Sequence, residues 1–206
     1  MRHIAITGGI GSGKSYVCRL LEERGISVYD CDAAAKRLMR TSPTLRRQLT
    51  ELIGPDAYLP QPHDTRQPHK PRQPQQPRNL NKAAVARFLL ASPENTQAIN
   101  DIVHPAVAAD FLQSGKQWLE SAILFQAGFD RRVHFDAVIC VTAPEEVRIR
   151  RIIRRDSISR ERAKQWLASQ WPQEEVLSRS DFGIVNDGRQ PLIPQIEKII
   201  NIINKS

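Results

Sequence analysis

The chain has 206 residues, enough for one domain or one domain with a small appendage, and a chain of this length can bury a core without disulfides or metals. Its three cysteines are widely spaced and include no C-x-x-C pair, which argues against a disulfide framework and against a zinc site. The formal net charge of +8 favours phosphate-rich partners or merely a solvated basic surface, but no RNA-binding signature or zinc finger accompanies it, so we expect no nucleic-acid partner.

The N-terminal part of the chain alternates apolar runs with amphipathic stretches. The apolar run His3–Thr7 leads into a glycine-rich loop and predicts a buried parallel strand. The elements expected next are a helix over Lys14–Glu23 that ends at Gly25, a strand over Ile26–Tyr29, a helix over Ala33–Met39 and a helix from Pro43 through Ile53.

The composition changes between Pro60 and Arg78, where six prolines and five glutamines leave almost no apolar side chain. Such a segment cannot pack a core, so we interpret it as a flexible surface insertion. The alternative is a docking segment for a partner with an aromatic groove, which proline content alone does not establish.

After the insertion, helical and strand patterns alternate again. The expected helices are one capped by Asn79 or Asn81 and running through Leu89, one from Ser92-Pro93 to Leu112 that is perturbed at Pro105, and others over Glu145–Arg155, from Ser159 through Trp166 and over Pro191–Ile202. The expected strands are Trp118–Phe125, Asp136–Val141 and Phe182–Val185. Strands that alternate with helices predict an α/β fold with a doubly wound parallel sheet, here of about five strands.

The stretch TGGIGSGKSY, Thr7–Tyr16, fits the pattern G-x-x-x-x-G-K-[ST]. Glycines let successive backbone N–H groups point at a phosphate, and the following helix directs its positive N-terminal end at the same anion. We expect Lys14 to reach the β- and γ-phosphates and Ser15 to hold Mg²⁺ through its hydroxyl. The other loop residues expected to bind ATP are Gly9, Gly11, Ser12 and Gly13.

Two aspartates in the segment YDCD follow the second predicted strand, and no guanine-reading motif of a GTPase is present. The carboxyl ends of neighbouring parallel strands face one crevice, so Asp30 and Asp32 are expected near the transferred phosphate. A carboxylate there can accept the proton of an acceptor hydroxyl. The alternative is that Asp32 only caps the alanine-rich helix that follows.

Five arginines lie in the segment EEVRIRRIIRRD. Arg151 and Arg155 are four residues apart and project from one helix face, which could close over the phosphates as a lid and exclude water. The alternative for this helix is a solvated basic face.

Several of these segments together resemble the dephospho-coenzyme A kinase family, which consists of P-loop kinases of the nucleoside-monophosphate-kinase type. The similar segments cover nearly the whole chain except Pro60–Arg78 and read ITGGIGSGKS, GISVYDCDAAAKRL, INDIVHPAV, ESAILFQAGFD, VTAPEEVRIRRIIRRDSISRERAKQWLASQ and SDFGIVNDG. The resemblance implies transfer of the ATP γ-phosphoryl group to the ribose 3′-hydroxyl of dephospho-coenzyme A, with Mg²⁺.

The resemblance also assigns roles to residues. It implies that Asp32 is the base and that Arg151 and Arg155 are lid arginines. The residues that it implies beside the acceptor are His104, Phe125 and Gln126, and those beside the ATP are Tyr16, Asn186 and Gly188. For His104, a histidine bonded to the helix backbone is the alternative. The departures from the family pattern are Tyr16 for threonine, Glu120 for aspartate, Ala122 for proline, Gln126 for glutamate and Asn81-Lys82 for Asp-Arg.

We therefore expect a single kinase domain with a core of residues 1–30, 116–143 and 176–206, a helical acceptor-binding region of residues 31–115 and a lid of residues 144–175. With no apolar run of 18 residues and no signal-peptide core, we expect a cytoplasmic enzyme without membrane association. The alternatives are another small-molecule P-loop kinase or a non-catalytic nucleotide-binding module. The oligomeric state, monomer or small homo-oligomer, is left open.

Overall fold

The computed structural model describes residues 2–59 and 79–205 and divides into two compact units. The sheet unit consists of Met1–Cys31 and Phe111–Ser206, and the helical unit consists of Asp32–Asp110. The proline- and glutamine-rich insertion predicted at Pro60–Arg78 lies outside the described residues.

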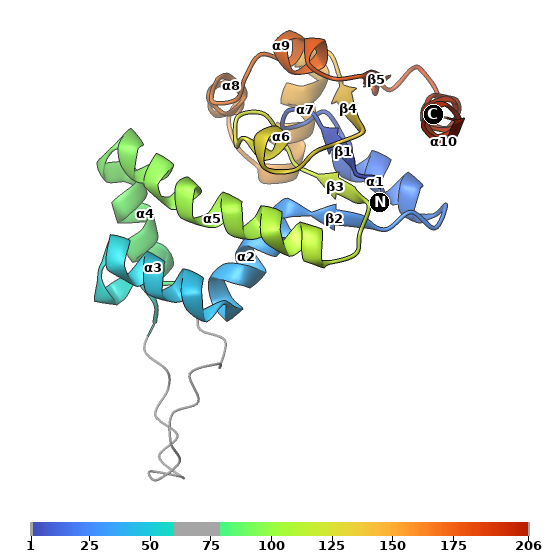
Figure 1. Ribbon diagram of the computed structural model, residues 1–206. Coiled ribbons are helices and arrows are strands. Elements are labelled where there is room, and N and C mark those ends of the chain that lie inside the picture. Colours follow the sequence, from blue (N-terminus) through green and yellow to red (C-terminus); the bar gives the residue numbers. More distant parts are fainter. Residues whose placement is uncertain (1, 60–78, 206) are drawn as a thin grey trace, which may run out of the picture. The chain divides into compact units, whose positions relative to one another are not determined.

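The sheet unit contains a five-stranded parallel sheet in the order β2-β3-β1-β4-β5, which confirms the predicted α/β fold (Figure 1). The strands are β1 (Ile4–Thr7), β2 (Val28–Asp30), β3 (Trp118–Glu120), β4 (Ala137–Thr142) and β5 (Phe182–Val185). Glu120 pairs with Asp30 on one side and with Ile6 on the other, so these three strands end at one edge of the sheet. That edge carries the glycine-rich loop, because the loop follows β1 directly.

Six helices of the described chain belong to the sheet unit. They are α1 (Lys14–Glu22), α6 (Phe129–Arg132), α7 (Glu145–Asp156), α8 (Arg160–Ala168), α9 (Gln173–Ser178) and α10 (Leu192–Lys205). Helices α1 and α10 pack on one face of the sheet, where Val17, Leu21 and Ile196 join Ile6 and Ile139 in the main apolar core. Burial of these aliphatic side chains is the chief stabilising term for the sheet that supports the loop.

The strand predicted over Trp118–Phe125 is wrong in its second half, because β3 ends at Glu120 and residues 121–128 form turns. The Ser121 hydroxyl accepts a hydrogen bond from the Ile123 N–H at 3.4 Å, a local bond that favours a turn over an extended strand. Apolar residues such as Leu124 are buried within the turns, so an apolar run alone did not distinguish them from a strand. The short helices α6 and α9 were not predicted.

The helical unit is built from α3 (Pro43–Ile53), the 3₁₀ turn η1 (Pro55–Ala57), α4 (Lys82–Ala91) and most of α2 (Cys31–Thr41) and α5 (Pro93–Gln113). Its core contains Leu49, Ala57 and Tyr58, and the Tyr58 hydroxyl donates to the Met39 carbonyl at 2.8 Å. Burial raises the pKa of Tyr58 to about 12, which keeps this phenol a hydrogen-bond donor.

Helix α5 passes through Pro105 without an interruption, so the perturbation predicted there is wrong. A proline cannot bond the carbonyl four residues earlier, which here belongs to Asp101. Both residues are solvent-exposed, and water can therefore satisfy that carbonyl.

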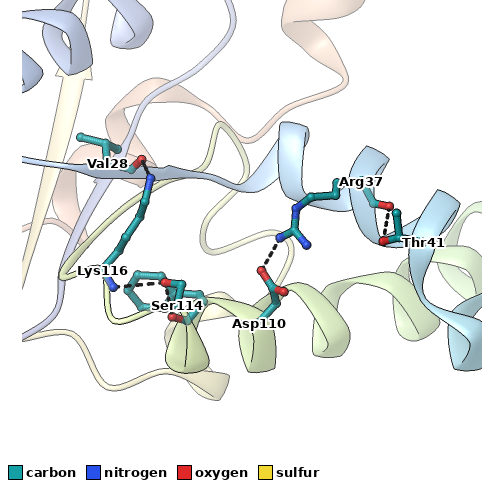
Figure 2. Close-up of polar contacts among 7 residues, drawn as sticks. Val28, Arg37, Thr41, Asp110, Ser114 and Lys116 are labelled. Carbon is teal, nitrogen blue, oxygen red and sulfur yellow. Dashed lines mark hydrogen bonds and ion pairs between the residues drawn. The ribbon is translucent and has the colours of Figure 1, made fainter. Parts of the chain in front are cut away.

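Polar contacts join neighbouring segments within each unit (Figure 2). In the helical unit, the Arg37 guanidinium of α2 pairs with the Asp110 carboxylate of α5 at 2.5 Å. In the sheet unit, the Lys116 ammonium donates to the Val28 carbonyl at 2.8 Å and ties the start of β2 to the turn before β3. None of the helices over residues 2–59 and 79–205 is long and apolar enough to span a bilayer.

Candidate active site

The glycine-rich loop between β1 and α1 requires glycine because the chain passes close to other backbone there. Gly8 has φ 137°, and a Cβ at this residue would lie 2.2 Å from the Val141 carbonyl oxygen of β4. Gly13 has φ 92°, a left-handed conformation from which helix α1 begins. The loop therefore places the N-terminus of α1 at the carboxyl edge of the sheet, as a phosphate cradle requires.

Lys14 lies at the mouth of this loop with its side chain mostly buried. Its ammonium nitrogen is 3.5 Å from the Gly9 carbonyl oxygen and 3.8 Å from a Glu120 carboxylate oxygen. Glu120 ends β3, so the sheet itself orients the lysine through this carboxylate. From the sequence, Glu120 was expected only as a departure from the family pattern inside a longer strand, so its position at a strand end is known from the structure alone.

The hydroxyl groups of the loop differ in their surroundings. The side-chain oxygens of Thr7 and Ser12 are buried and have no hydrogen-bond partner among the described residues. Ser15 and Tyr16, in the first turn of α1, are exposed, and the Arg19 guanidinium lies 5.4 Å from the Tyr16 ring centre. Ser15 thus presents an exposed hydroxyl directly after the lysine, as a Mg²⁺ ligand must.

Of the two predicted lid arginines, Arg151 contacts the loop and Arg155 does not. The Arg151 guanidinium donates to the carbonyls of Gly11 at 3.3 Å and Ser12 at 3.1 Å. Arg155 instead pairs with the neighbouring Asp156 at 2.8 Å, with its side chain 61% exposed. The Arg151 charge therefore lies within the phosphate loop, and the Arg155 charge lies at the surface.

Asn186, which the family resemblance places beside the ATP, follows β5 and joins this network. Its side-chain amide donates to the Ser12 carbonyl at 2.9 Å, and its own carbonyl accepts from Arg151 at 3.0 Å. A Cβ at Gly13 would lie 2.1 Å from the Asn186 amide nitrogen, so that glycine is also needed for this contact. Gly188 has φ 83° in the loop that follows.

Two further residues contact the loop and were not singled out from the sequence. The Arg148 guanidinium of α7 donates to the Ile10 carbonyl at 2.9 Å, and the side chain of Gln170 accepts from the Ile10 N–H at 2.7 Å. Burial lowers the pKa of Arg148, but the pKa of an arginine is so far above neutral pH that the guanidinium stays charged. Contacts across 138 and 160 residues leave no local sequence pattern.

The predicted acceptor residues Phe125 and Gln126 lie in the turns after β3. Phe125 is buried, and the Arg179 guanidinium lies 5.9 Å from its ring centre and 4.8 Å from that of Trp171. The Gln126 amide donates to the Ser169 carbonyl at 3.4 Å. The turns after β3 are thereby linked to the segment that follows α8.

The predicted acceptor residues Asp32 and His104 belong to the helical unit. Helix α2 begins at Cys31, so Asp32 lies in its first turn rather than before it. Its carboxylate is exposed, and its negative charge interacts favourably with the positive N-terminal end of the helix. Asp30 is the last residue of β2 in the sheet unit, and His104 is half-buried on α5.

No cluster of three metal-binding His, Cys, Asp or Glu side chains occurs among the residues with described positions. The donor set that the loop offers is a serine hydroxyl beside phosphate-binding N–H groups, which suits a hard cation that shares phosphate oxygens. Cys18 and Cys140 are poor nucleophiles, because burial raises the pKa of Cys18 to about 12 and that of Cys140 to about 11.

A sequence model described as dephospho-CoA kinase matches residues 2–191. The chain belongs to the dephospho-CoA kinase family. A family member from Bacteroides fragilis strain YCH46 is 40% identical over 204 residues, which cover 96% of this chain and 90% of that protein. A member from Chlorobaculum tepidum is 34% identical over 206 residues, which cover 95% and 92%.

Solved structures support the same fold. A crystal structure from Thermus thermophilus matches with a TM-score of 0.74 and 29% identity over 98% of this chain and 96% of that chain. The dephospho-CoA kinase of Campylobacter jejuni matches with a TM-score of 0.59 and 19% identity, covering 100% and 97% of the two chains. Family membership makes this chain a kinase that phosphorylates dephospho-coenzyme A with ATP in coenzyme A biosynthesis, as the sequence resemblance predicted.

Proposed function

We propose that the sheet unit binds MgATP at the loop Gly8–Ser15 and that Asp32 accepts the proton of the ribose 3′-hydroxyl as the γ-phosphoryl group is transferred. The observation that carries this proposal is Lys14, buried at the mouth of the loop and oriented by Glu120, in a member of a kinase family. An ammonium fixed there neutralises charge between the β- and γ-phosphates, and this stabilisation is a large part of phosphoryl-transfer catalysis.

Arg151 is proposed to stabilise charge on the transferred group from the lid side. Its bonds to the Gly11 and Ser12 carbonyls support this role, because they hold a guanidinium within the loop that receives the triphosphate. Asn186, which bonds the same Ser12 carbonyl, and Gly188 are proposed to lie beside the adenine. Arg155, which pairs with Asp156 at the surface, is proposed to contribute less than Arg151 to binding the phosphates.

The divalent metal of the reaction is proposed to be Mg²⁺, held by the Ser15 hydroxyl. The exposed position of Ser15 at the start of α1 supports this assignment. Mg²⁺ usually keeps several waters and is bound through one or two protein oxygens together with substrate phosphates, which fits a single hydroxyl. When bound, the metal neutralises charge on the β- and γ-phosphate oxygens.

Asp32 is proposed as the base because it matches the family's position and follows the end of β2 by two residues. A carboxylate positioned at the acceptor hydroxyl typically contributes a factor of roughly 10²–10⁴ in rate. His104, Phe125 and Gln126 are proposed to contact the acceptor. We further propose a cytoplasmic enzyme whose partners are ATP and dephospho-coenzyme A.

The test of this function is ADP release by the purified chain with ATP, Mg²⁺ and a panel of acceptors. Dephospho-coenzyme A is expected to support turnover, whereas adenosine and pantetheine phosphate are not. Mass spectrometry of the product should show one added phosphoryl group on the ribose 3′-oxygen. Preferred turnover of adenosine would indicate a nucleoside kinase, and ATP binding without turnover of any acceptor would indicate a nucleotide-binding module.

A further inference from the structure

Ile10 is the only residue of the stretch Gly8–Ser15 with a large apolar side chain, and that side chain packs away from the phosphate cradle. It joins an apolar cluster made by α7, α8 and the turn between them. The members of this cluster are Ile10, Ile149, Ile152, Ile153, Ile158, Ala163, Trp166 and Leu167. The loop and these helices therefore share one small core, which is distinct from the core under the sheet.

Both backbone groups of Ile10 are also held by the same region. The Arg148 Nε donates to the Ile10 carbonyl at 2.9 Å, and the Gln170 Oε1 accepts from the Ile10 N–H at 2.7 Å. Arg148 is 7% exposed, so its bond is shielded from competing water. One peptide position is thus held on three sides, by its side chain, its carbonyl and its N–H.

Two of the loop glycines are explained by this arrangement rather than by turn geometry alone. A Cβ at Gly9 would lie 2.2 Å from the Arg148 Nη2 and 3.1 Å from the Gln170 Oε1. A Cβ at Gly11 would lie 2.7 Å from the Arg148 backbone carbonyl oxygen. Glycine at both positions lets Arg148 cross the tip of the loop from one side of Ile10 to the other.

We propose that Arg148 and Gln170 are positioning residues for ATP, which fix the tip of the phosphate loop through Ile10. The other N–H groups of the loop can cradle a triphosphate only if the loop keeps one shape, and ordering it in advance reduces the entropic cost of binding. Arg151 lies one helical turn after Arg148 on α7 and bonds the Gly11 and Ser12 carbonyls. The loop conformation and the placement of Arg151 are therefore coupled through one helix.

The turnover measurements depend on the proposed function, because they need dephospho-coenzyme A as the acceptor. The ATP-binding measurements do not depend on it, because they are made without an acceptor. The test variants are Gln170→Met, which keeps the side-chain length, and Arg148→Met, which keeps an unbranched apolar stem but is shorter than arginine and removes its charge. Each variant removes the hydrogen bond to Ile10. The conservative variant is Arg148→Lys, which keeps the charge and a donor. The matched controls are Arg150→Met and Gln165→Met, exposed residues on α7 and α8 that do not contact the loop.

Isothermal titration calorimetry gives the dissociation constant for MgATP, steady-state kinetics give kcat and the KM for dephospho-coenzyme A, and thermal melts show whether each variant is folded. Arg148→Met and Gln170→Met are each expected to weaken ATP binding roughly tenfold, the size of one lost hydrogen bond to an ordered loop. The KM of both Met variants for dephospho-coenzyme A should stay within about twofold of the wild-type value. Arg148→Lys should recover part of the ATP affinity. The control variants should bind ATP and turn over as wild type does. The double variant should cost less than the sum of the single changes, because both act through Ile10.

Two results would overturn the inference. One is an ATP dissociation constant within about twofold of wild type in both folded Met variants. The other is a purely structural effect. In that case the melting temperature and the active fraction of the variants fall, the protein that remains folded binds ATP as wild type does, and Arg148→Lys restores neither the melting temperature nor the active fraction. If wild type binds ATP but fails to turn over dephospho-coenzyme A, the proposed function fails, and the binding data still decide the role of Arg148 and Gln170.

Discussion

Asp30 and Asp32 are two residues apart, yet one ends a strand and the other lies in the first turn of a helix. Asp32→Asn keeps the shape and an oxygen near the helix end but removes the proton acceptor. Turnover at saturating ATP and dephospho-coenzyme A should fall by roughly 10²–10⁴, with ATP affinity and melting temperature nearly unchanged. Asp30→Asn is the matched control and should lower turnover less than Asp32→Asn does. If Asp30→Asn abolished turnover and Asp32→Asn left it normal, Asp32 would not be the base and would only stabilise the positive end of its helix.

Removal of Lys14 would expose the Gly9 carbonyl and the Glu120 carboxylate, which are among its partners. Lys14→Ala should lower turnover by roughly 10²-fold or more, because the β- and γ-phosphates lose their ammonium and the Glu120 carboxylate is left facing them. Lys14→Ala combined with Glu120→Gln should recover part of the ATP affinity by removing that repulsion. Turnover of Lys14→Ala within tenfold of wild type, measured as ADP release, is the result that contradicts this assignment.

Cys18 on α1 and Cys140 on β4 are buried thiols, and burial raises their pKa values from 9.0 to about 12 and about 11. At pH 8 both should resist iodoacetamide in the folded protein and react in guanidinium chloride, as peptide mass spectrometry can measure. The unfolded thiols ionise near pH 9, whereas the folded ones do not. Stability is therefore fully present below about pH 9 and should fall as the pH rises toward the folded pKa values. Rapid labelling of folded protein at pH 8 would contradict the burial of these groups.

At the scale of elements, helix α7 carries the contrast between Arg151 and Arg155. Arg151→Met should lower kcat more than it weakens ATP binding, because a guanidinium within the loop acts most strongly on charge that grows in the transition state. Arg155→Met should have a smaller effect, since this side chain is paired with Asp156 and largely exposed. Equal losses in kcat for both variants would mean that Arg155 leaves its ion pair during the reaction.

The elements that sequence patterns predicted well are those with a local cause. The loop was found from glycine spacing, and the strands β1, β4 and β5 from short apolar runs. The strand expected over Trp118–Phe125 was too long, because buried turn residues such as Leu124 are as apolar as a strand. The helix expected at Ala33 begins two residues earlier, which moves Asp32 into the first turn.

Contacts between distant elements were the part of the site that no pattern could supply. Arg148 was one of five arginines in its segment, and nothing local marked it as the buried one that bonds Ile10. Gln170 reaches Ile10 from 160 residues away, so only the fold shows that they meet. Asn186 was expected beside the ATP from the family resemblance, but its bond to the Ser12 carbonyl, 174 residues away, was not. Glu120 was missed for a related reason, because the strand predicted over Trp118–Phe125 placed it inside a strand and not at the end that borders the phosphate loop.

At the scale of the whole molecule, the segment Pro60–Arg78 can be tested as a unit. The described residues on either side are already joined, because Tyr58 and Leu80 form an antiparallel bridge and the Leu59 N–H donates to the Asn79 carbonyl at 2.9 Å. A short Gly/Ser linker in place of Gln61–Pro77 can therefore close this junction with little change in loop entropy. Melting temperature should stay within about 3 °C and turnover near wild type. A large loss of either would show that the segment packs or contacts substrate.

The most direct test of the whole account is ATP-dependent turnover of dephospho-coenzyme A by wild type and Asp32→Asn, measured with MgATP affinity on the same preparations. The account predicts that wild type releases ADP with this acceptor and forms the 3′-phosphorylated product. It also predicts that Asp32→Asn binds MgATP normally and turns over roughly 10²–10⁴ times more slowly. Absence of phosphorylated product from wild type, or full turnover by Asp32→Asn, would contradict it.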